Sequence, residues 1–260
     1  MSPAPDARGD EGDQGVVREA HRQHPRSDRV AHPTRWLLAG GRPVARWLVR
    51  RRWDVRVHHA DRFPADGPVV LAANHIGVVD GPLLVLLAPR PVHALTKIEM
   101  FSSAVGGGFL RLAGQVPLDR HRTDPAAVRR AVRVLREGGV VGVFPEGTRG
   151  DGELRTFRRG AAYLAMVTGA PVVPVTILGT RRPGGASGSL PPKGDRIDLV
   201  VGHPVRVSPH SWPRTAEQVG SVSTLLHQRM REELAAALSE TGRELPGPLP
   251  ATELVKESDD

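Results

Sequence analysis

The chain has 260 residues, of which 39% are apolar and 25% charged, and its formal net charge is +8. This length suffices for one large domain with a sizeable core. The chain contains no cysteine, which excludes disulfides, thiolate metal sites and a cysteine nucleophile. The positive charge suggests an acidic partner such as nucleic acid, an anionic membrane surface or a phosphorylated substrate. The alternative is a compositional bias of the genome, because 33 of the 36 basic residues are arginines in a chain that is also rich in Ala, Gly and Pro.

Both ends of the chain are predicted to be disordered tails that tolerate truncation. Residues 1–30 are rich in Pro, Asp, Gly, Arg and Gln without periodicity, and residues 243–260 are similar and mildly acidic. The first tail lacks the apolar stretch of a signal peptide. No run of the chain approaches the roughly 18 apolar residues of a membrane-spanning helix. We therefore expect a protein that is soluble or lies on a membrane surface.

Residues 31–54 are predicted to form an amphipathic helical segment that associates with a membrane. Three of the four tryptophans, Trp36, Trp47 and Trp53, fall here among several arginines. Tryptophan combined with arginine is typical of a helix at a membrane interface. The alternative is a helix packed against the domain with its tryptophans buried. Pro43 predicts a break near the middle of the segment.

Between residues 55 and 242, short apolar runs alternate with helical stretches. The expected strands are Val69–Ala73, Val92–Thr96, Val116–Leu118, Val140–Phe144, Val172–Ile177 and Ile197–Val201. The expected helices are Gly81–Ala88, Phe101–Leu112, one from Pro125 to Gly138 with Asp124 as its N-cap, Arg158–Thr168, and Ala216–Ser239 with Thr215 and Gln218 at capping-box spacing. This alternation predicts a single α/β domain, residues 55–242, with a mixed, largely parallel sheet flanked by helices.

The first chemically distinctive segment is Asn74-His75, which follows the apolar run Val69–Ala73 and precedes Asp80 by a few residues. A histidine whose second nitrogen meets a carboxylate can act as a base near neutral pH, because the carboxylate fixes the tautomer and stabilises the imidazolium. Taken alone, the same spacing also fits a structural histidine followed by a helix N-cap.

The second distinctive segment is Phe144-Pro145-Glu146-Gly147-Thr148-Arg149, which follows the run Val140–Phe144. The glycine allows the backbone to approach a ligand closely, and the arginine offers a fork of donors suited to phosphate. Glu146 is expected to pair with Arg149 or to hold a substrate hydroxyl. A simple turn after a strand is the structural alternative. If the two preceding strands are parallel neighbours, both segments lie at one edge of the sheet.

The sequence offers no other nucleophile for His75 to activate. Cysteine is absent, and no Gly-x-Ser-x-Gly segment provides a serine elbow. A metal site is disfavoured because the adjacent pair His58-His59 cannot share a helix face and no His-Glu-x-x-His spacing occurs. We therefore expect His75 to activate the hydroxyl of a substrate directly.

Together these segments resemble the conserved blocks of the glycerolipid acyltransferases, especially the 1-acyl-glycerol-3-phosphate acyltransferase family. Asn74-His75 with Asp80 is similar to the first block, Gly114 to Arg120 to the second, and Phe144–Arg149 to the third. Val173-Pro174-Val175 is similar to the fourth block. Lys97-Ile98-Glu99-Met100 looks like the family's Lys-x-Glu-Leu segment. The resemblance covers about residues 55–205 and keeps the order of the blocks.

The resemblance implies a fold and a reaction. It implies the transfer of a fatty acyl group from acyl-CoA or acyl-carrier protein to a glycerol hydroxyl, with no cofactor and no covalent enzyme intermediate. His75 would be the general base and Asp80 its orienting partner. The residues implied to bind the acceptor's phosphate are Arg120, Glu146, Gly147, Thr148 and Arg149, with possible support from Asn74 and Lys97. The implied partners are a lyso-lipid, the acyl donor and the anionic cytoplasmic face of the cell membrane, and not nucleic acid.

Two departures from the family pattern leave the acceptor open. Pro117 stands where the second block usually has an aromatic residue, and Gly150 stands where the third block usually ends in serine. The first hypothesis is lysophosphatidic acid as acceptor. The second is the same chemistry on another lysophospholipid, an amino-acid lipid or a glycolipid. The third is a non-catalytic basic protein that binds membranes or nucleic acid.

Overall fold

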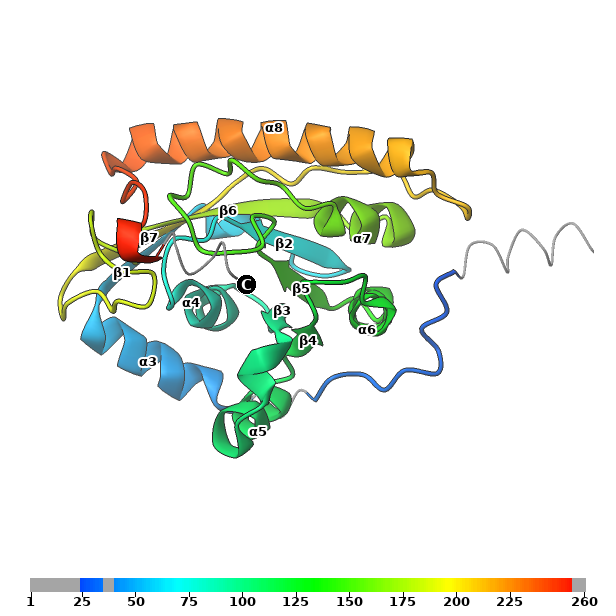
Figure 1. Ribbon diagram of the computed structural model, residues 1–260, viewed down its shortest axis with the longest axis horizontal. Coiled ribbons are helices and arrows are strands. Elements are labelled where there is room, and N and C mark those ends of the chain that lie inside the picture. The colour runs from blue at the N-terminus through cyan, green and yellow to red at the C-terminus, as the bar shows by residue number, and fades with distance from the viewer. Residues whose placement is uncertain (1–23, 35–39, 254–260) are drawn as a thin grey trace, which may run out of the picture.

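The computed structural model describes residues 24–34 and 40–253. These residues form a seven-stranded sheet in the order β1-β7-β6-β2-β5-β3-β4 (Figure 1). Five of its six strand pairings are parallel, and the β6–β7 pairing is antiparallel. The strands are β1 (Asp54–His58), β2 (Val69–Ala73), β3 (Val92–Lys97), β4 (Val116–Leu118), β5 (Val140–Val143), β6 (Val172–Leu178) and β7 (Arg196–Val201). This confirms the expected α/β domain with a mixed, largely parallel sheet.

Helices cover both faces of the sheet. They are α3 (Arg42–Arg52), α4 (Asp80–Leu87), α5 (Ala104–Leu112), α6 (Pro125–Arg136), α7 (Gly160–Thr168) and α8 (Ala216–Thr241), with the short 3-10 helices η1 (Ala60–Arg62) and η2 (Ile98–Phe101). One core cluster packs α6, α7 and α8 on one face, and a second packs α4 on the other (Figure 1). β2 contributes Val70 and Ala72 to the first cluster and Val69, Leu71 and Ala73 to the second. The strand is therefore buried on both faces, as its continuous apolar sequence indicates.

The expected helix starts are observed at two N-caps. The Asp124 side chain accepts hydrogen bonds from the backbone nitrogens of Ala126 and Ala127 at the start of α6. Thr215 and Gln218 form the capping box of α8. Both caps satisfy backbone N–H groups that have no partner inside the helix.

The strand β1 was not among the expected strands. Charged residues alternate with valine in Asp54–His58, and among the described residues the strand lies at one end of the sheet, beside β7. An edge strand with exposed charged side chains lacks the apolar run that marked the central strands. The segment predicted to be helical therefore ends before residue 54, and the strand begins there.

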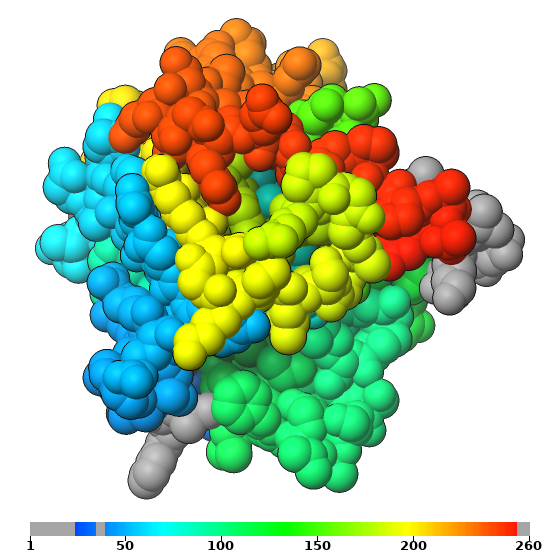
Figure 2. Space-filling model, turned by 90° about the vertical axis from the view of Figure 1, so that its left-hand side faces the viewer, coloured from blue at the N-terminus to red at the C-terminus, as the bar shows by residue number. Residues whose placement is uncertain are grey.

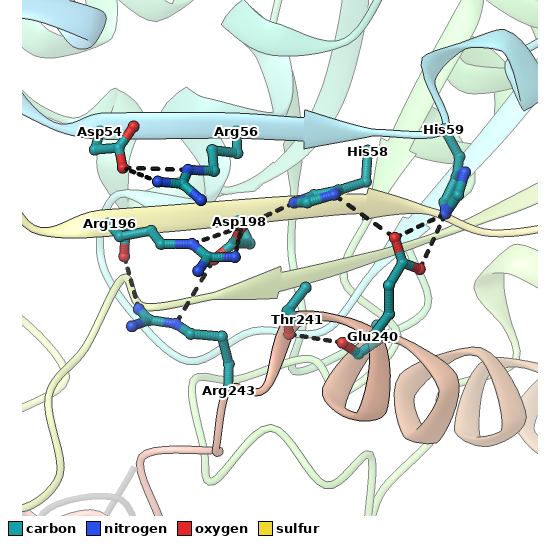
Figure 3. Close-up of polar contacts among 10 residues, drawn as sticks. Asp54, Arg56, His58, His59, Arg196, Asp198, Glu240, Thr241 and Arg243 are labelled. Atoms are coloured by element: carbon teal, nitrogen blue, oxygen red, sulfur yellow. Dashed lines mark hydrogen bonds and ion pairs between the residues drawn. The ribbon is translucent and has the colours of Figure 1, made fainter.

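A polar cluster joins β1 and β7 to the C-terminal end of α8 (Figure 3). Asp198 is fully buried, and its Oδ1 lies 2.8 Å from Nε2 of His58 and accepts a hydrogen bond from Arg196. Glu240, near the end of α8, lies 3.0 Å from Nε2 of His59. The contact of His59 with Glu240 therefore holds the C-terminal end of α8 against the end of β1.

Parts of the two predicted tails pack against the domain. Residues 1–23 and 254–260 lie outside the described residues, but residues 24–30 and 243–253 do not. Ser27 is buried and its hydroxyl accepts a hydrogen bond from Arg136. Near the other end, Leu249 is buried and the carbonyl of Gly247 accepts a hydrogen bond from Arg181. Distant arginines thus hold backbone and polar groups of these two stretches.

The helix α3 begins at Arg42, so Pro43 lies in its first turn. Proline is tolerated there because the N–H it lacks would have no partner inside the helix. Trp47 is exposed, whereas Trp53 is half-buried and donates a hydrogen bond to the carbonyl of Pro191. Trp36 lies outside the described residues. Within the described residues, no helix combines the length and the apolar character needed to cross a membrane.

Candidate active site

The two distinctive loops leave the same edge of the sheet. β2 and β5 are parallel neighbours in register, with Val69 opposite Val140. The loops that follow them also contact each other directly. The backbone nitrogen of Gly150 donates to the carbonyl of His75 at 2.9 Å, and the backbone nitrogen of His75 donates to Oε1 of Glu146 at 2.7 Å. The expectation that both loops belong to one place in the fold is therefore met.

His75 and Asp80 form a hydrogen-bonded pair. Nδ1 of His75 lies 2.9 Å from Oδ2 of Asp80, which also accepts hydrogen bonds from the backbone nitrogens of Ile76 at 2.6 Å and Gly77 at 2.8 Å. Asp80 is fully buried, whereas the His75 side chain is 20% exposed and its ring stacks on that of Phe144. This geometry holds the proton on Nδ1 and leaves Nε2 as the basic nitrogen.

The second nitrogen of His75 is available for chemistry. Among the described residues, no hydrogen-bond partner lies at Nε2, and the ring reaches the surface beside the Glu146 loop. A neutral imidazole in this state accepts a proton from a hydroxyl that approaches from solvent. This geometry is one that a general base with an orienting carboxylate requires.

Asn74 supports the loop from inside the sheet. Its side-chain amide donates to the carbonyl of Ile177 at 3.0 Å and accepts from the nitrogen of the same residue at 2.7 Å, and only 1% of its surface is exposed. These bonds replace a strand pairing between the end of β2 and the end of β6. Asn74 therefore anchors the start of the His75 loop.

Glu146 is buried beneath the His75 loop. Burial raises the pKa of its carboxyl group to about 7, the hydrogen bond from the His75 nitrogen acts to lower it, and the negative charges of Asp151 and Asp80 raise it further. One expectation was that the Glu146 carboxylate pairs with Arg149. This pair does not form. Instead, Nη1 of Arg149 donates to the carbonyl of Ser187 at 3.1 Å. Glu146 thus holds the main chain of His75, and Arg149 holds the loop that follows β6.

Basic side chains gather around Gly147. Nη1 of Arg120 donates to the carbonyl of Gly147, and Nη1 of Arg158 donates to the carbonyl of Arg120 at 3.4 Å. Gly147 has a positive φ of 80°, and a Cβ added there would lie 2.1 Å from Nε of Arg158. The positive φ favours glycine, and the Arg158 side chain would have to move to make room for a Cβ. The structure therefore brings Arg120 and Gly147 together, as expected, and adds Arg158, which sequence reasoning did not single out.

The remaining candidate residues lie around this cluster. Thr148 follows Gly147 in the loop and is half-buried. Nζ of Lys97, at the C-terminal end of β3, lies 3.8 Å from Oε1 of Glu99. β3 is the neighbour of both β5 and β4, so Lys97 lies at the same edge of the sheet as the two loops.

Two further residues contact the site from the turn after β6. The Thr180 hydroxyl donates to Oδ1 of Asp80, and Nε of Arg181 donates to the carbonyl of Ile76 at 2.9 Å. Both side chains are buried. The signal that could have revealed them is their position directly after a strand that neighbours β2, because such positions share the edge that carries His75.

Comparison with known proteins identifies the family. A family model described as "Acyltransferase" matches residues 54–178. The chain is 31% identical over 186 residues to the 1-acyl-sn-glycerol-3-phosphate acyltransferase of Bacillus subtilis, an alignment that covers 71% of this chain and 90% of that protein. The chain belongs to the 1-acyl-sn-glycerol-3-phosphate acyltransferase family. It is therefore an O-acyltransferase, and the hypothesis of a non-catalytic binding protein is wrong.

Other relatives agree with this assignment. The crystal structure of the 1-acyl-sn-glycerophosphate acyltransferase PlsC from Thermotoga maritima superimposes with a TM-score of 0.54 at 26% identity, over 75% of this chain and 77% of that one. The chloroplastic acyltransferase BAT2 of Brassica napus is 31% identical over 67% of this chain, which spans about half of that relative's length. The expected fold of a glycerolipid acyltransferase is thereby confirmed.

Proposed function

We propose that this acyltransferase moves a fatty acyl group from a thioester to the free hydroxyl of 1-acylglycerol-3-phosphate, which gives phosphatidic acid in phospholipid biosynthesis. The observation that carries the proposal is the position of the His75–Asp80 pair beside the basic cluster of Arg120 and Arg158 around Gly147. A base next to an anion-binding cluster suits an acceptor that carries both a hydroxyl and a phosphate. The names of the relatives point to the same acceptor.

The proposed reaction needs one base and no covalent enzyme intermediate. Nε2 of His75 takes the proton of the acceptor hydroxyl as the oxygen attacks the thioester carbonyl. Asp80 stabilises the imidazolium that forms. When the tetrahedral intermediate collapses, the C–S bond breaks and the thiolate takes the proton from His75. The products are the new ester and the free thiol, and the histidine returns to its neutral state.

The acceptor's phosphate is proposed to bind at the loop from Glu146 to Arg149 together with Arg120. Nε of Arg120 is buried without a hydrogen-bond partner among the described residues, so the guanidinium keeps unused donor capacity at this place. An arginine fork binds phosphate oxygens in pairs. Arg158 adds a second positive charge next to Gly147. The cost of burying part of Arg120 is offset when an anion binds.

The test is a measurement of thiol release from acyl-CoA and from acyl-carrier protein, each with a panel of lyso-lipid acceptors. We expect 1-acylglycerol-3-phosphate to give the highest kcat/KM. A higher value with another lysophospholipid, an amino-acid lipid or a glycolipid would favour the second acceptor hypothesis, which Pro117 and Gly150 motivate. The two donors in parallel arms decide between CoA and carrier protein as the co-substrate.

We also propose that the enzyme lies on the cytoplasmic face of the cell membrane through α3 and α5. Val44, Trp47 and Leu48 are exposed at helical spacing on α3, and Val105, Phe109 and Leu112 are exposed at helical spacing on α5. Both helices project from the same side of the sheet (Figure 1). The exposed Arg50 and Arg51 border the stripe on α3. Apolar stripes bordered by arginines suit an anionic lipid interface.

The membrane proposal is tested by co-sedimentation with vesicles that contain anionic lipid. The variant Trp47→Gln with Leu48→Gln should bind several-fold less well than the parent. A matched variant on the far side of the molecule, Leu225→Gln on α8, should bind as the parent does, since this residue is exposed to a similar extent. Equal loss in both variants would contradict the proposed surface.

A further inference from the structure

The Asp80 carboxylate is held by donors from two separate parts of the chain. Oδ2 accepts from the His75 ring and from two backbone nitrogens of the same loop. Oδ1 accepts from the Thr180 hydroxyl, which comes from the turn after β6. Among the described residues, the Thr180 hydroxyl is the hydrogen-bond donor to Oδ1 of Asp80. Because Asp80 is fully buried, water does not replace a donor lost at this oxygen.

The turn that carries Thr180 packs closely against the His75 loop. A Cβ added at Gly77 would lie 2.7 Å from the carbonyl oxygen of Thr180, so the two backbones touch at this point. Gly179, the preceding residue, has a positive φ of 84°, and a Cβ there would lie 2.1 Å from Nη2 of Arg243. Glycines on both sides of the contact therefore let Thr180 reach Asp80.

Arg181 fastens the same turn to two other loops and to the C-terminal segment. This buried side chain is 3% exposed. Its guanidinium donates to the carbonyls of Ile76 at 2.9 Å, Gly150 at 2.9 Å, Gly185 at 3.0 Å and Gly247 at 2.6 Å. These carbonyls belong to the His75 loop, the Glu146 loop, the loop after β6 and the C-terminal segment. The last two lie next to each other on the face shown in Figure 2, in yellow and red.

A second arginine supports the turn from the other side. Nη2 of Arg243 donates to the carbonyl of Arg196 at 2.6 Å, and its Nε lies 3.6 Å from Oδ2 of Asp198 (Figure 3). The guanidinium is thereby held against Gly179. The turn is thus held by Arg243 and by Arg181. These two arginines restrict the positions that the Thr180 side chain can adopt.

We propose that Thr180 is a positioning residue for the transfer reaction, because its hydroxyl fixes the Asp80 carboxylate that orients His75. Thr180 acts through Asp80 and does not touch the reacting atoms. This inference rests on the proposed role of His75 as general base. Thr180 would be a third member beside His75 and Asp80. It follows β6, which neighbours β2 on the side opposite to β5.

The test compares two substitutions that differ by the hydroxyl. Thr180→Val keeps the shape and removes the donor, and Thr180→Ser keeps the donor and removes a methyl group. We expect kcat of Thr180→Val to fall about 10- to 100-fold, the effect of losing one hydrogen bond to a charged group, with KM for 1-acylglycerol-3-phosphate nearly unchanged. Thr180→Ser should stay within a few-fold of the parent. Thr176→Val, a buried threonine on β6, is the matched control and should keep the parent's kcat.

A second readout does not depend on turnover. The Nδ1–H proton of His75 should give a downfield proton NMR signal, assigned by its loss in His75→Gln. We expect Thr180→Val to broaden or remove this signal and Thr180→Ser to retain it. An unchanged signal together with an unchanged kcat in Thr180→Val would overturn the proposal, as would an equal loss in Thr180→Ser. If 1-acylglycerol-3-phosphate gives no turnover while the signal responds to Thr180→Val, the acceptor assignment fails and the positioning role stands.

Discussion

The carboxylate of Glu146 lies 2.7 Å from the backbone nitrogen of His75, so a side chain from one loop holds the main chain of the other. The contact crosses between two parallel strands, and the return contact runs from Gly150 to the carbonyl of His75. The proposed base and the proposed phosphate loop are therefore held together by direct hydrogen bonds, and a shift of one loop would shift the other. A change in the charge or length of the Glu146 side chain is expected to move both.

The pKa of Glu146 predicts how stability depends on pH. Its pKa rises from an ordinary 4.5 in the unfolded chain to about 7 in the folded protein, chiefly because of burial. Between these values the folded protein binds more protons than the unfolded chain, so the free energy of unfolding falls as pH rises. The full difference is on the order of 3 kcal/mol. Tm measured from pH 5 to pH 8 should therefore decline more steeply in the parent than in Glu146→Gln.

The control for this prediction is Glu253→Gln. Its carboxylate is accessible, and hydrogen bonding to Ser187 lowers its pKa, so it has no reason to titrate between pH 5 and pH 8. Glu253→Gln should keep the parent's decline of Tm across this range. Parallel curves for the parent and Glu146→Gln would show that Glu146 is ionised throughout the range and would contradict the raised pKa.

Replacement of His75 by alanine should abolish most of the transfer. General base catalysis contributes roughly 10²- to 10⁴-fold, so the initial rate of thiol release should fall by about that factor. The substitution His203→Ala is a suitable comparison, because this exposed histidine pairs with Glu233. Circular dichroism and Tm establish that both variants fold. Full activity in a folded His75→Ala protein would rule out the proposed mechanism.

Replacement of Arg158 by alanine should weaken binding of the acceptor. Its guanidinium lies over Gly147 and donates to the carbonyl of Arg120, so its loss removes a positive charge from the proposed phosphate site. We expect KM for 1-acylglycerol-3-phosphate to rise roughly 10-fold, in line with the loss of one charge-assisted hydrogen bond. The neighbouring substitution Arg159→Ala should leave KM unchanged. A similar increase in both would indicate a general effect of net charge.

The capping box of α8 predicts a loss of stability without a loss of function. Thr215→Ala removes the oxygen that accepts the hydrogen bond from the Gln218 nitrogen, which costs about 1 kcal/mol. Tm should fall by about 2–4 °C for a domain of this size. Thr224→Ala is the comparison, because this exposed threonine lies within the helix and donates to the carbonyl of Gly220. A Tm for Thr215→Ala as high as that of Thr224→Ala would mean that the cap contributes nothing.

The sequence predicted those elements whose signals are local. β2 and β4 have the expected bounds, and Asp124 and Thr215 cap the expected helices, because apolar runs and N-caps are read within a few residues. The pairing of His75 with Asp80 is also local, at a separation of 5 residues. The grouping of the two loops required the additional assumption of parallel neighbouring strands, which the structure confirms.

The parts that the sequence did not reveal depend on distant contacts. Arg181 bonds residues that are 31, 66 and 105 positions away, and Thr180 bonds a residue 100 positions away. Such contacts leave no periodic pattern along the chain. The packing of the C-terminal segment also depends on a distant contact, the bond from Arg181 to the carbonyl of Gly247. Taken alone, a stretch rich in proline and glycine resembles a tail.

The antiparallel pairing of β6 with β7 sends α8 back across the sheet, and the residues after it return to the His75 loop through Arg181. A protease that cut between Gly242 and Gly247 would spare every proposed catalytic and phosphate-binding residue. It would nevertheless release the carbonyl of Gly247 from a buried guanidinium that also holds Ile76. Clipped material in a purified sample would then lower the measured specific activity, so the intact mass of each preparation should be checked before variants are compared.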